Sequence, residues 1–237
     1  MITLYGMSSP NVLKISVMLH ELSVNYRFQH VNLGTGEQFE PDFVALNPNS
    51  KVPVIVDETG PDGRRYVVFE SGAILLYLAE KHERFLPADR TGRYDVIQWL
   101  MIQMANVGPM LGQLTHFIRF APGGNDYSVS RYRTAAGRVY DMLDRRLAGS
   151  GNLAGEPYTI ADIATFPWVW LYHEKHGMTW SEHPHLRRWC ETIAARPAVA
   201  QALDIYEKRA AGDPSLQSDL PQDGLDRFFG WGRYSRR

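Results

Sequence analysis

Residues 47–81 read NPNSKVPVIVDETGPDGRRYVVFESGAILLYLAEK, and this stretch decides the fold. Two apolar segments rich in β-branched residues, at 52–56 and 66–69, flank a loop of Asp, Gly and Pro residues at 57–63, which predicts a β-hairpin. Apolar residues at helical spacing follow over residues 71–80. The stretch therefore predicts two antiparallel strands followed by a helix.

The residues before this stretch alternate between strand and helix patterns. A strand is predicted at residues 2–5, and a helix begins near Pro10 with Ser9 or Asn11 as its N-terminal cap. Apolar and polar residues alternate again over 26–30, which predicts a second strand. A βαβ unit, a short helical connection and a ββα unit together favour an α/β domain of thioredoxin-like arrangement over residues 1–81.

The pattern changes after this domain. Residues 82–93 contain Pro87, Asp89 and Gly92 and predict a linker. Residues 94–210 show helical periodicity without strand alternation and predict a separate all-α domain. The helical segments lie at 96–104, 127–148, 160–176, 185–196 and 198–210. Within them, Thr159 and Asp162 have the spacing of an N-terminal capping box. The tail, residues 211–237, fits either a docked or a loose arrangement.

Composition excludes several classes of function. The chain of 237 residues has 25 Lys plus Arg and 26 Asp plus Glu, so its charge gives no support for a nucleic-acid partner. No apolar run approaches the roughly 18–20 residues of a membrane span, and the first residues show no secretion signal, so a cytoplasmic protein without membrane contact is expected. Cys190 is the only cysteine, which excludes an intrachain disulfide. Any thiol chemistry must use a thiol from outside.

Three short motifs of the first domain are predicted to meet at one end of its sheet: residues 9–11, 52–53 and 70–71. A cis bond between Val52 and Pro53 would leave the Val52 backbone free to pair with an extended peptide. The alternative for Pro53 is an edge-strand proline without a ligand. Ser71 begins a helix and would hold a carboxylate there, or would simply cap the helix, whereas Glu70 would take an ammonium.

The turn into the first helix carries two further polar residues. Ser9 and Asn11 would stabilise a thiolate by donating hydrogen bonds to it, or would act only as caps of the helix. Gln38 and Lys51 would bind a second carboxylate, or would be solvated surface groups. The combination favours a site for a small peptide that brings its own thiol.

These motifs resemble those of a known family. Residues 9–11, 47–55 and 69–81 are similar to the glutathione-binding motifs of the glutathione transferase superfamily, and residues 108–113 and 159–164 extend the similarity into the helical domain. The nearest group is the bacterial nu class, with the relatives of the prion-forming nitrogen regulator. Ser9 stands where the nu motif usually has threonine, and Val12 where it has glycine. Neither a tyrosine nor a cysteine occupies this turn, which argues against the tyrosine-type and cysteine-type enzymes.

The resemblance implies roles for individual residues. Glutathione would be the co-substrate, with its sulfur poised by Ser9 and Asn11 as catalytic residues. The residues implied to bind glutathione are Gln38 and Lys51 at the glycyl carboxylate, Val52 and Pro53 at the cysteinyl part, and Glu70 and Ser71 at the γ-glutamyl end. Arg131 is the candidate for holding a second glutathione. The helical domain would form the acceptor pocket, for which the candidates are His116, Arg119, Phe120, Trp168 and Tyr172. A homodimer is also implied.

The implied function is that of an enzyme using a bound glutathione thiolate, first of all as a disulfide reductase. One glutathione would attack a small-molecule disulfide and a second would resolve the mixed disulfide. The alternatives are conjugation to an electrophile, thiolytic ether cleavage, and a glutathione-binding regulatory protein with little turnover. No metal is expected, because the spacing of His173, His176, His183 and His185 fits no zinc site and favours surface or helix-end histidines. Cys190 is interpreted as a core residue.

Overall fold

The computed structural model describes residues 1–121, 123–213 and 222–230. The chain divides into two compact units. The first comprises Met1–Tyr77 with the described part of Ala200–Arg237, and the second comprises Leu78–Val199. The predicted helical domain ended at residue 210, whereas most of the last predicted helix groups with the first unit. One contact that joins this helix to the first unit is made by Arg209, whose guanidinium carbon lies 3.7 Å from the centre of the Phe28 ring.

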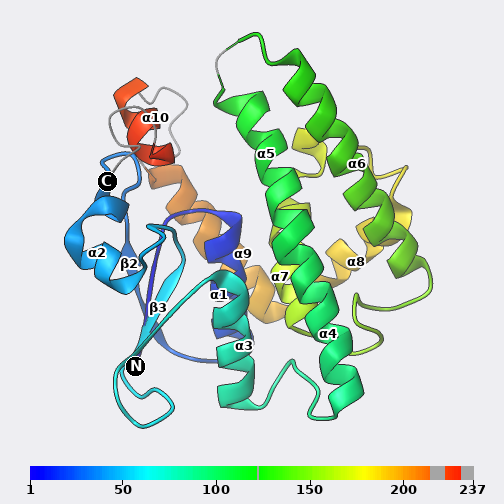
Figure 1. Cartoon of the computed structure of the whole chain (residues 1–237). Helices are drawn as coiled ribbons and strands as arrows, with labels where there is room; N and C mark the ends of the chain where they lie inside the picture. Colours follow the sequence, from blue (N-terminus) through cyan, green and yellow to red (C-terminus); the bar gives the residue numbers. More distant parts are fainter. Residues whose placement is uncertain (122, 214–221, 231–237) are drawn as a thin grey trace. The chain divides into compact units, whose positions relative to one another are not determined.

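The first unit contains a four-stranded sheet of order β2-β1-β3-β4 (Figure 1). The strands are β1 (Ile2–Gly6), β2 (Tyr26–His30), β3 (Val54–Asp57) and β4 (Tyr66–Phe69). β1 and β2 are parallel, and β3 is antiparallel to both of its neighbours. This confirms the predicted thioredoxin-like arrangement. β3 begins two residues later than the pattern indicated, because Pro53 has no N–H to donate to a neighbouring strand.

The first unit also contains helices, which come from both of its chain segments. They are α1 (Pro10–Glu21), the short η1 (Glu37–Phe39), α2 (Pro41–Leu46), α9 (Pro197–Gly212) and α10 (Gln222–Phe229), and α3 (Ser71–His82) begins in it. α1 is buried along almost its whole length, including Lys14. On the α2 side, Phe43 packs with Val31 and Val54 into a small hydrophobic cluster. The sheet and its helices thereby fix the turns that carry residues 9–11, 52–53 and 70–71.

The second unit is entirely helical, as predicted. It consists of α4 (Arg90–Ile102), the π-helical turn η2 (Gln103–Val107), α5 (Gly108–Arg119), α6 (Asp126–Ala148), α7 (Ile160–Tyr172), η3 (Glu174–His176) and α8 (Pro184–Ala194). α5 and α6 lie side by side (Figure 1). α7 begins with the predicted capping box of Thr159 and Asp162. α5 lies outside the helical segments predicted from periodicity, and it follows α4 through η2 without a loop.

The segment between α3 and α4 is shorter than the linker predicted at residues 82–93. α3 extends to His82, and α4 begins at Arg90 because Asp89 caps it and accepts a hydrogen bond from Gly92 N at 2.8 Å. Arg93, predicted within the linker, lies in α4 and forms an ion pair with Glu80 of α3. Among the described residues, no helix has both the length and the hydropathy needed to span a membrane.

Candidate active site

The turn into α1 places a serine hydroxyl at the start of a helix. Ser9 is the N-cap, with extended backbone angles, and its Oγ accepts a hydrogen bond from Val12 N at 3.4 Å. Ser9, not Asn11, is thus the capping residue, and Pro10 occupies the first helical position between them. Because the cap uses a lone pair of Oγ, the hydroxyl hydrogen remains available to a further acceptor. Capping the helix and stabilising a thiolate are therefore compatible roles for Ser9.

The segment before β3 is held by a residue that the predicted site did not include. The Asn47 side chain donates from Nδ2 to Lys51 O at 2.8 Å and accepts from Asn49 N at 2.9 Å. Asn47 is buried, whereas Lys51 is exposed and Val52 half-buried. The bond between Val52 and Pro53 is cis. Asn47 fixes the backbone that presents Lys51 and Val52, and its place in an Asn-Pro-Asn turn is the sequence signal that points to it.

The start of α3 combines a strained backbone, a buried serine and a buried lysine. Glu70 has a left-handed φ of 67°, and its carbonyl accepts from Ile74 N at 2.9 Å, so it stands at the N-cap of α3. The Ser71 side chain is buried, and its Oγ accepts a hydrogen bond from Lys14 Nζ at 3.1 Å. Lys14 lies in α1 and is only 1% exposed.

Burial lowers the pKa of Lys14 to about 7, although the nearby negative charge of Glu70 opposes this shift. Sequence reasoning missed Lys14. The available signal was its position between Leu13 and Ile15, in a helix with apolar residues on every side. A lysine in such a helix has no solvated face to occupy.

Gln38 and the tail meet in the first unit. Gln38 is 2% exposed, and its Nε2 donates to the backbone oxygen of Arg227 in α10 at 2.8 Å. This burial excludes the alternative that Gln38 is a solvated surface group. Asp213, at the end of α9, accepts from Ser8 N at 3.0 Å and lies 3.4 Å from His30 Nε2. The described part of the tail is therefore docked on this unit, immediately beside the residue that precedes Ser9.

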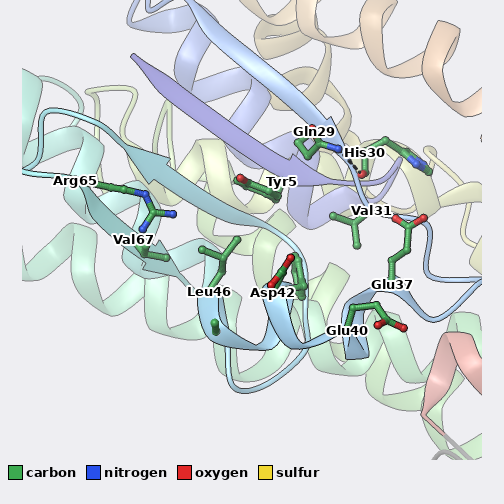
Figure 2. A pocket seen from close by; sticks show the side chains of 12 residues that line it. Tyr5, Gln29, His30, Val31, Glu37, Glu40, Asp42, Leu46, Arg65 and Val67 are labelled. Atoms are coloured by element: carbon green, nitrogen blue, oxygen red, sulfur yellow. Dashed lines mark hydrogen bonds between the residues drawn. The ribbon is translucent and has the colours of Figure 1, made fainter.

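A separate hollow lies between the sheet and α2 (Figure 2). It has a volume of about 610 Å³ and is lined by Tyr5, Gln29, His30, Val31, Glu37, Glu40, Asp42, Phe43, Ala45, Leu46, Arg65 and Val67. In the view of Figure 2, Glu37 and Glu40 lie at one end of the hollow, Arg65 lies at the other end, and Asp42 lies between them. None of the predicted glutathione-binding residues lines this hollow, so it is distinct from the candidate site.

The predicted acceptor residues of the helical unit lie on two helices. His116 and Arg119 belong to α5 and Phe120 follows it, with the Arg119 guanidinium carbon 4.9 Å from the centre of the Phe120 ring. Trp168 and Tyr172 belong to α7, with ring centres 5.6 Å apart.

The two groups are close enough to interact. Burial raises the pKa of Tyr172, and the charge of Arg119 opposes that shift. Burial also lowers the pKa of His116. Trp168 packs against Gly112 of α5, where an added Cβ would lie 3.3 Å from the indole ring.

Arg131, predicted to hold a second glutathione, is exposed on α6. A hollow of about 380 Å³ lies on the same helix and is lined by Asp126, Val129, Ser130, Arg133 and Thr134. The arginine that lines it is Arg133 rather than Arg131. The role of Arg131 stays a prediction.

Three of the four histidines are not on the surface, contrary to one alternative of the prediction, whereas His185 is half-buried. His173, His176 and His183 are buried, although they do lie at helix ends. His173 Nε2 is 3.0 Å from His183 Nδ1, and His176 Nδ1 is 2.8 Å from the Tyr140 hydroxyl. Burial is the main cause that lowers the pKa of His173 and of His176 to about 4. These rings join α7, η3 and α8 to α6. Among the described residues, no cluster of His, Cys, Asp and Glu is arranged to hold a metal.

Cys190 lies in α8 and is 0% exposed, which confirms its interpretation as a core residue. Burial raises the pKa of its thiol well above the usual value. Neither its position nor its protonation state suits a nucleophile.

Comparison with known proteins identifies the family. Residues 1–80 match the family model of the glutathione S-transferase N-terminal domain, and residues 108–197 match that of the C-terminal domain. The disulfide-bond oxidoreductase YfcG of Escherichia coli strain K12 is 44% identical over 204 residues, which cover 86% of this chain and 94% of YfcG.

Solved structures extend this similarity. A glutathione transferase from Burkholderia graminis with two glutathione molecules bound per subunit is 42% identical, with a TM-score of 0.80 over 86% of this chain and 87% of that one. A glutathione transferase from Pseudomonas putida with one glutathione disulfide bound per subunit is 38% identical, with a TM-score of 0.81 over 86% of this chain and 91% of that one. As its motifs predict, the chain belongs to the glutathione transferase superfamily, and its relatives there include the nu class and Ure2.

Proposed function

We propose that this protein is a glutathione-dependent disulfide reductase whose nucleophile is the thiolate of bound glutathione. The observation that carries the proposal is the position of Ser9, a hydroxyl donor at the N-terminus of α1 in a chain whose one cysteine is buried elsewhere. A hydroxyl and the positive end of a helix lower the pKa of a thiol. The name of YfcG as a disulfide-bond oxidoreductase supports this reaction, as does the glutathione disulfide in the Pseudomonas putida structure.

Glutathione would lie across the three turns of the first unit. The backbone of Val52, beside Pro53, pairs with the cysteinyl part, Glu70 accepts from the γ-glutamyl ammonium, and the Ser71 hydroxyl donates to its carboxylate. The exposed Lys51 faces the glycyl carboxylate. This arrangement directs the sulfur to Ser9 and Asn11. Family resemblance adds a homodimer and a cytoplasmic location to the proposal.

The reaction requires two glutathione molecules for each disulfide reduced. The bound thiolate attacks one sulfur of the substrate disulfide, a new sulfur–sulfur bond forms to glutathione, and the other substrate sulfur leaves as a thiolate that takes up a proton. A second glutathione thiolate then attacks the glutathione sulfur of this mixed disulfide. The second substrate thiol is released, and oxidised glutathione is formed. The two glutathione molecules per subunit in the Burkholderia graminis structure support this stoichiometry.

The helical unit would supply the remaining contacts. Arg131 is the proposed partner of the second glutathione, and the substrate would contact His116, Arg119 and Phe120 of one group and Trp168 and Tyr172 of the other. The close approach of these two groups supports a shared pocket.

The test is the rate at which the protein reduces a small symmetrical disulfide with glutathione, followed through the oxidised glutathione formed. We expect turnover well above the uncatalysed exchange. A background rate combined with thioether formation from an electrophile would replace the proposal with conjugation. A background rate in both assays, with glutathione still bound, would indicate a regulatory binding protein.

A further inference from the structure

Lys14 is a buried charged group that the proposed chemistry does not use. Its side chain leaves α1 and reaches the first residue of α3, where Nζ lies 3.1 Å from Ser71 Oγ. At 1% exposure, its ammonium has lost nearly all contact with water. Placing a charged group in such a position is unfavourable unless other groups compensate for the lost hydration. The hydrogen bond to Ser71 is one such compensating contact, and it ties Lys14 to the start of α3.

The hydrogen bond between Lys14 and Ser71 has only one possible direction when the lysine is charged. An ammonium carries three donors and no acceptor, so Ser71 Oγ must accept from it. The single hydroxyl hydrogen of Ser71 therefore points away from Lys14 and donates in another direction. Lys14 thereby orients the Ser71 hydroxyl as a donor, which is the orientation that a carboxylate ligand needs.

The charge of Lys14 acts in the same sense. The N-terminus of α3 carries partial positive charge, which destabilises the nearby Lys14 ammonium and would stabilise a ligand carboxylate bound to Ser71. The negative charge of Glu70 favours the charged form of Lys14, but the Glu70 side chain is exposed and water screens its charge. A ligand carboxylate on Ser71 would place a negative charge one hydrogen bond away from the ammonium.

We propose that Lys14 is a positioning residue of the glutathione site, which orients the Ser71 hydroxyl toward the γ-glutamyl carboxylate and supplies this carboxylate with a buried positive charge. The inference rests on the proposed function, because it takes Ser71 as the carboxylate-binding residue. Lys14 itself acts through Ser71.

This arrangement links ligand binding to proton uptake. Burial lowers the pKa of Lys14 to about 7 despite Glu70, so above this pH much of the lysine is neutral in the free protein. A carboxylate on Ser71 favours the charged form and raises that pKa. Above neutral pH, binding should therefore be accompanied by proton uptake at Lys14.

The experiment uses the full-length protein and S-methylglutathione, which has the two carboxylates of glutathione but no thiol proton to lose. Calorimetric titration in buffers of different ionisation enthalpy gives both the affinity and the number of protons taken up. We expect uptake by the wild-type protein, and for Lys14→Met an affinity about tenfold weaker with the uptake abolished. Lys208→Met is the matched control, because Lys208 lies in α9 of the same unit with a side chain 74% exposed.

A double-mutant cycle separates positioning from a merely structural role. If Lys14 acts through Ser71, replacing it in a Ser71→Ala background should weaken binding by less than twofold. An equal loss in both backgrounds would contradict the proposal. Thermal unfolding of each variant shows whether it is folded. If Lys14→Met does not fold, the proton uptake of the wild-type protein on binding S-methylglutathione decides the question.

Two failures can be told apart. Binding of S-methylglutathione to the wild-type protein without proton uptake would overturn the role of Lys14 and leave the glutathione site in place. No binding at all would overturn both. Proton uptake in a protein that fails to reduce disulfides would overturn the proposed reaction and uphold the inference.

Discussion

The two ends of the proposed glutathione site are built in different ways. At the γ-glutamyl end, Ser71 is fixed by Lys14 from within the N-terminal domain, and Glu70 holds a left-handed backbone conformation beside it. At the glycyl end, Gln38 is bonded to Arg227 of α10, 189 residues away in the chain. One end is complete within its domain, whereas the other shares a residue with the tail.

This difference changes the role expected for Gln38. Its donor Nε2 is engaged by α10, and its Oε1 is buried and has no hydrogen-bond partner among the described residues. An amide oxygen is an acceptor and repels a carboxylate. While α10 is docked, we therefore expect the glycyl carboxylate to contact the exposed Lys51, and Gln38 to hold the tail through Arg227. We expect the γ-glutamyl end to determine most of the affinity.

The largest effect is expected between the two ends, where the sulfur lies. Asn11→Ala should lower the rate of disulfide reduction about 100-fold, the magnitude typical of losing one preorganised donor to a developing anion, with much less change in glutathione affinity. Steady-state kinetics and titration of the same variant measure both quantities. Because Ser9 already caps α1, a loss confined to affinity would show that Asn11 does not contact sulfur.

The second prediction compares the ends directly. Ser71→Ala should weaken glutathione binding by about 1–3 kcal/mol, roughly 5- to 150-fold, through loss of a hydrogen bond to a charged group. Gln38→Ala should weaken it less than threefold, because its donor is bonded to α10. Ser181→Ala, an exposed serine of the helical unit, serves as the control. Equal losses for Ser71 and Gln38 would refute the proposed asymmetry.

A smaller effect is expected where the tail reaches the catalytic turn. Asp213 accepts from Ser8 N, so Asp213→Ala leaves a buried donor unpaired next to Ser9 and should lower turnover severalfold. Asp213→Asn retains a side-chain oxygen at this place and should keep most of the activity. If the two variants lose the same activity, the charge of Asp213 matters and its hydrogen bond to Ser8 does not explain the effect.

The smallest effect is expected far from both ends. Cys190→Ala should leave disulfide reduction within about twofold of the wild-type rate, because its thiol is buried and its pKa is raised. The variant should lose some stability through the cavity it leaves, which thermal unfolding would detect. A fall in turnover beyond about tenfold, 1.4 kcal/mol in the barrier, would mean that a protein thiol takes part in the reaction.

The sequence predicts features that depend on residues close together in the chain. The hairpin of β3 and β4 follows from its turn residues, and the capping box of Thr159 and Asp162 follows from a spacing of three. Ser9 as a helix cap is of the same kind. These motifs were enough for the fold and for the family resemblance.

Features that depend on distant contacts could not be predicted. Lys14 is buried against a residue 57 positions away, and Asp213 meets Ser8 across 205 positions. The burial of His173 and His183 arises where α6, α7 and α8 meet, which no spacing along one helix encodes. Charged and polar side chains are usually exposed, so each of these residues resembles a surface group until the packing is known.

The central claim is that the protein holds glutathione as a thiolate, and the most direct test is the thiol pKa of bound glutathione. Ultraviolet absorbance of the thiolate, followed against pH at saturating protein, measures it. Free cysteine thiols titrate near 8.5, and we expect the bound thiol to titrate well below this value in the wild-type protein and close to it in Asn11→Ala. A bound thiol that titrates like free glutathione in the wild-type protein would contradict the account.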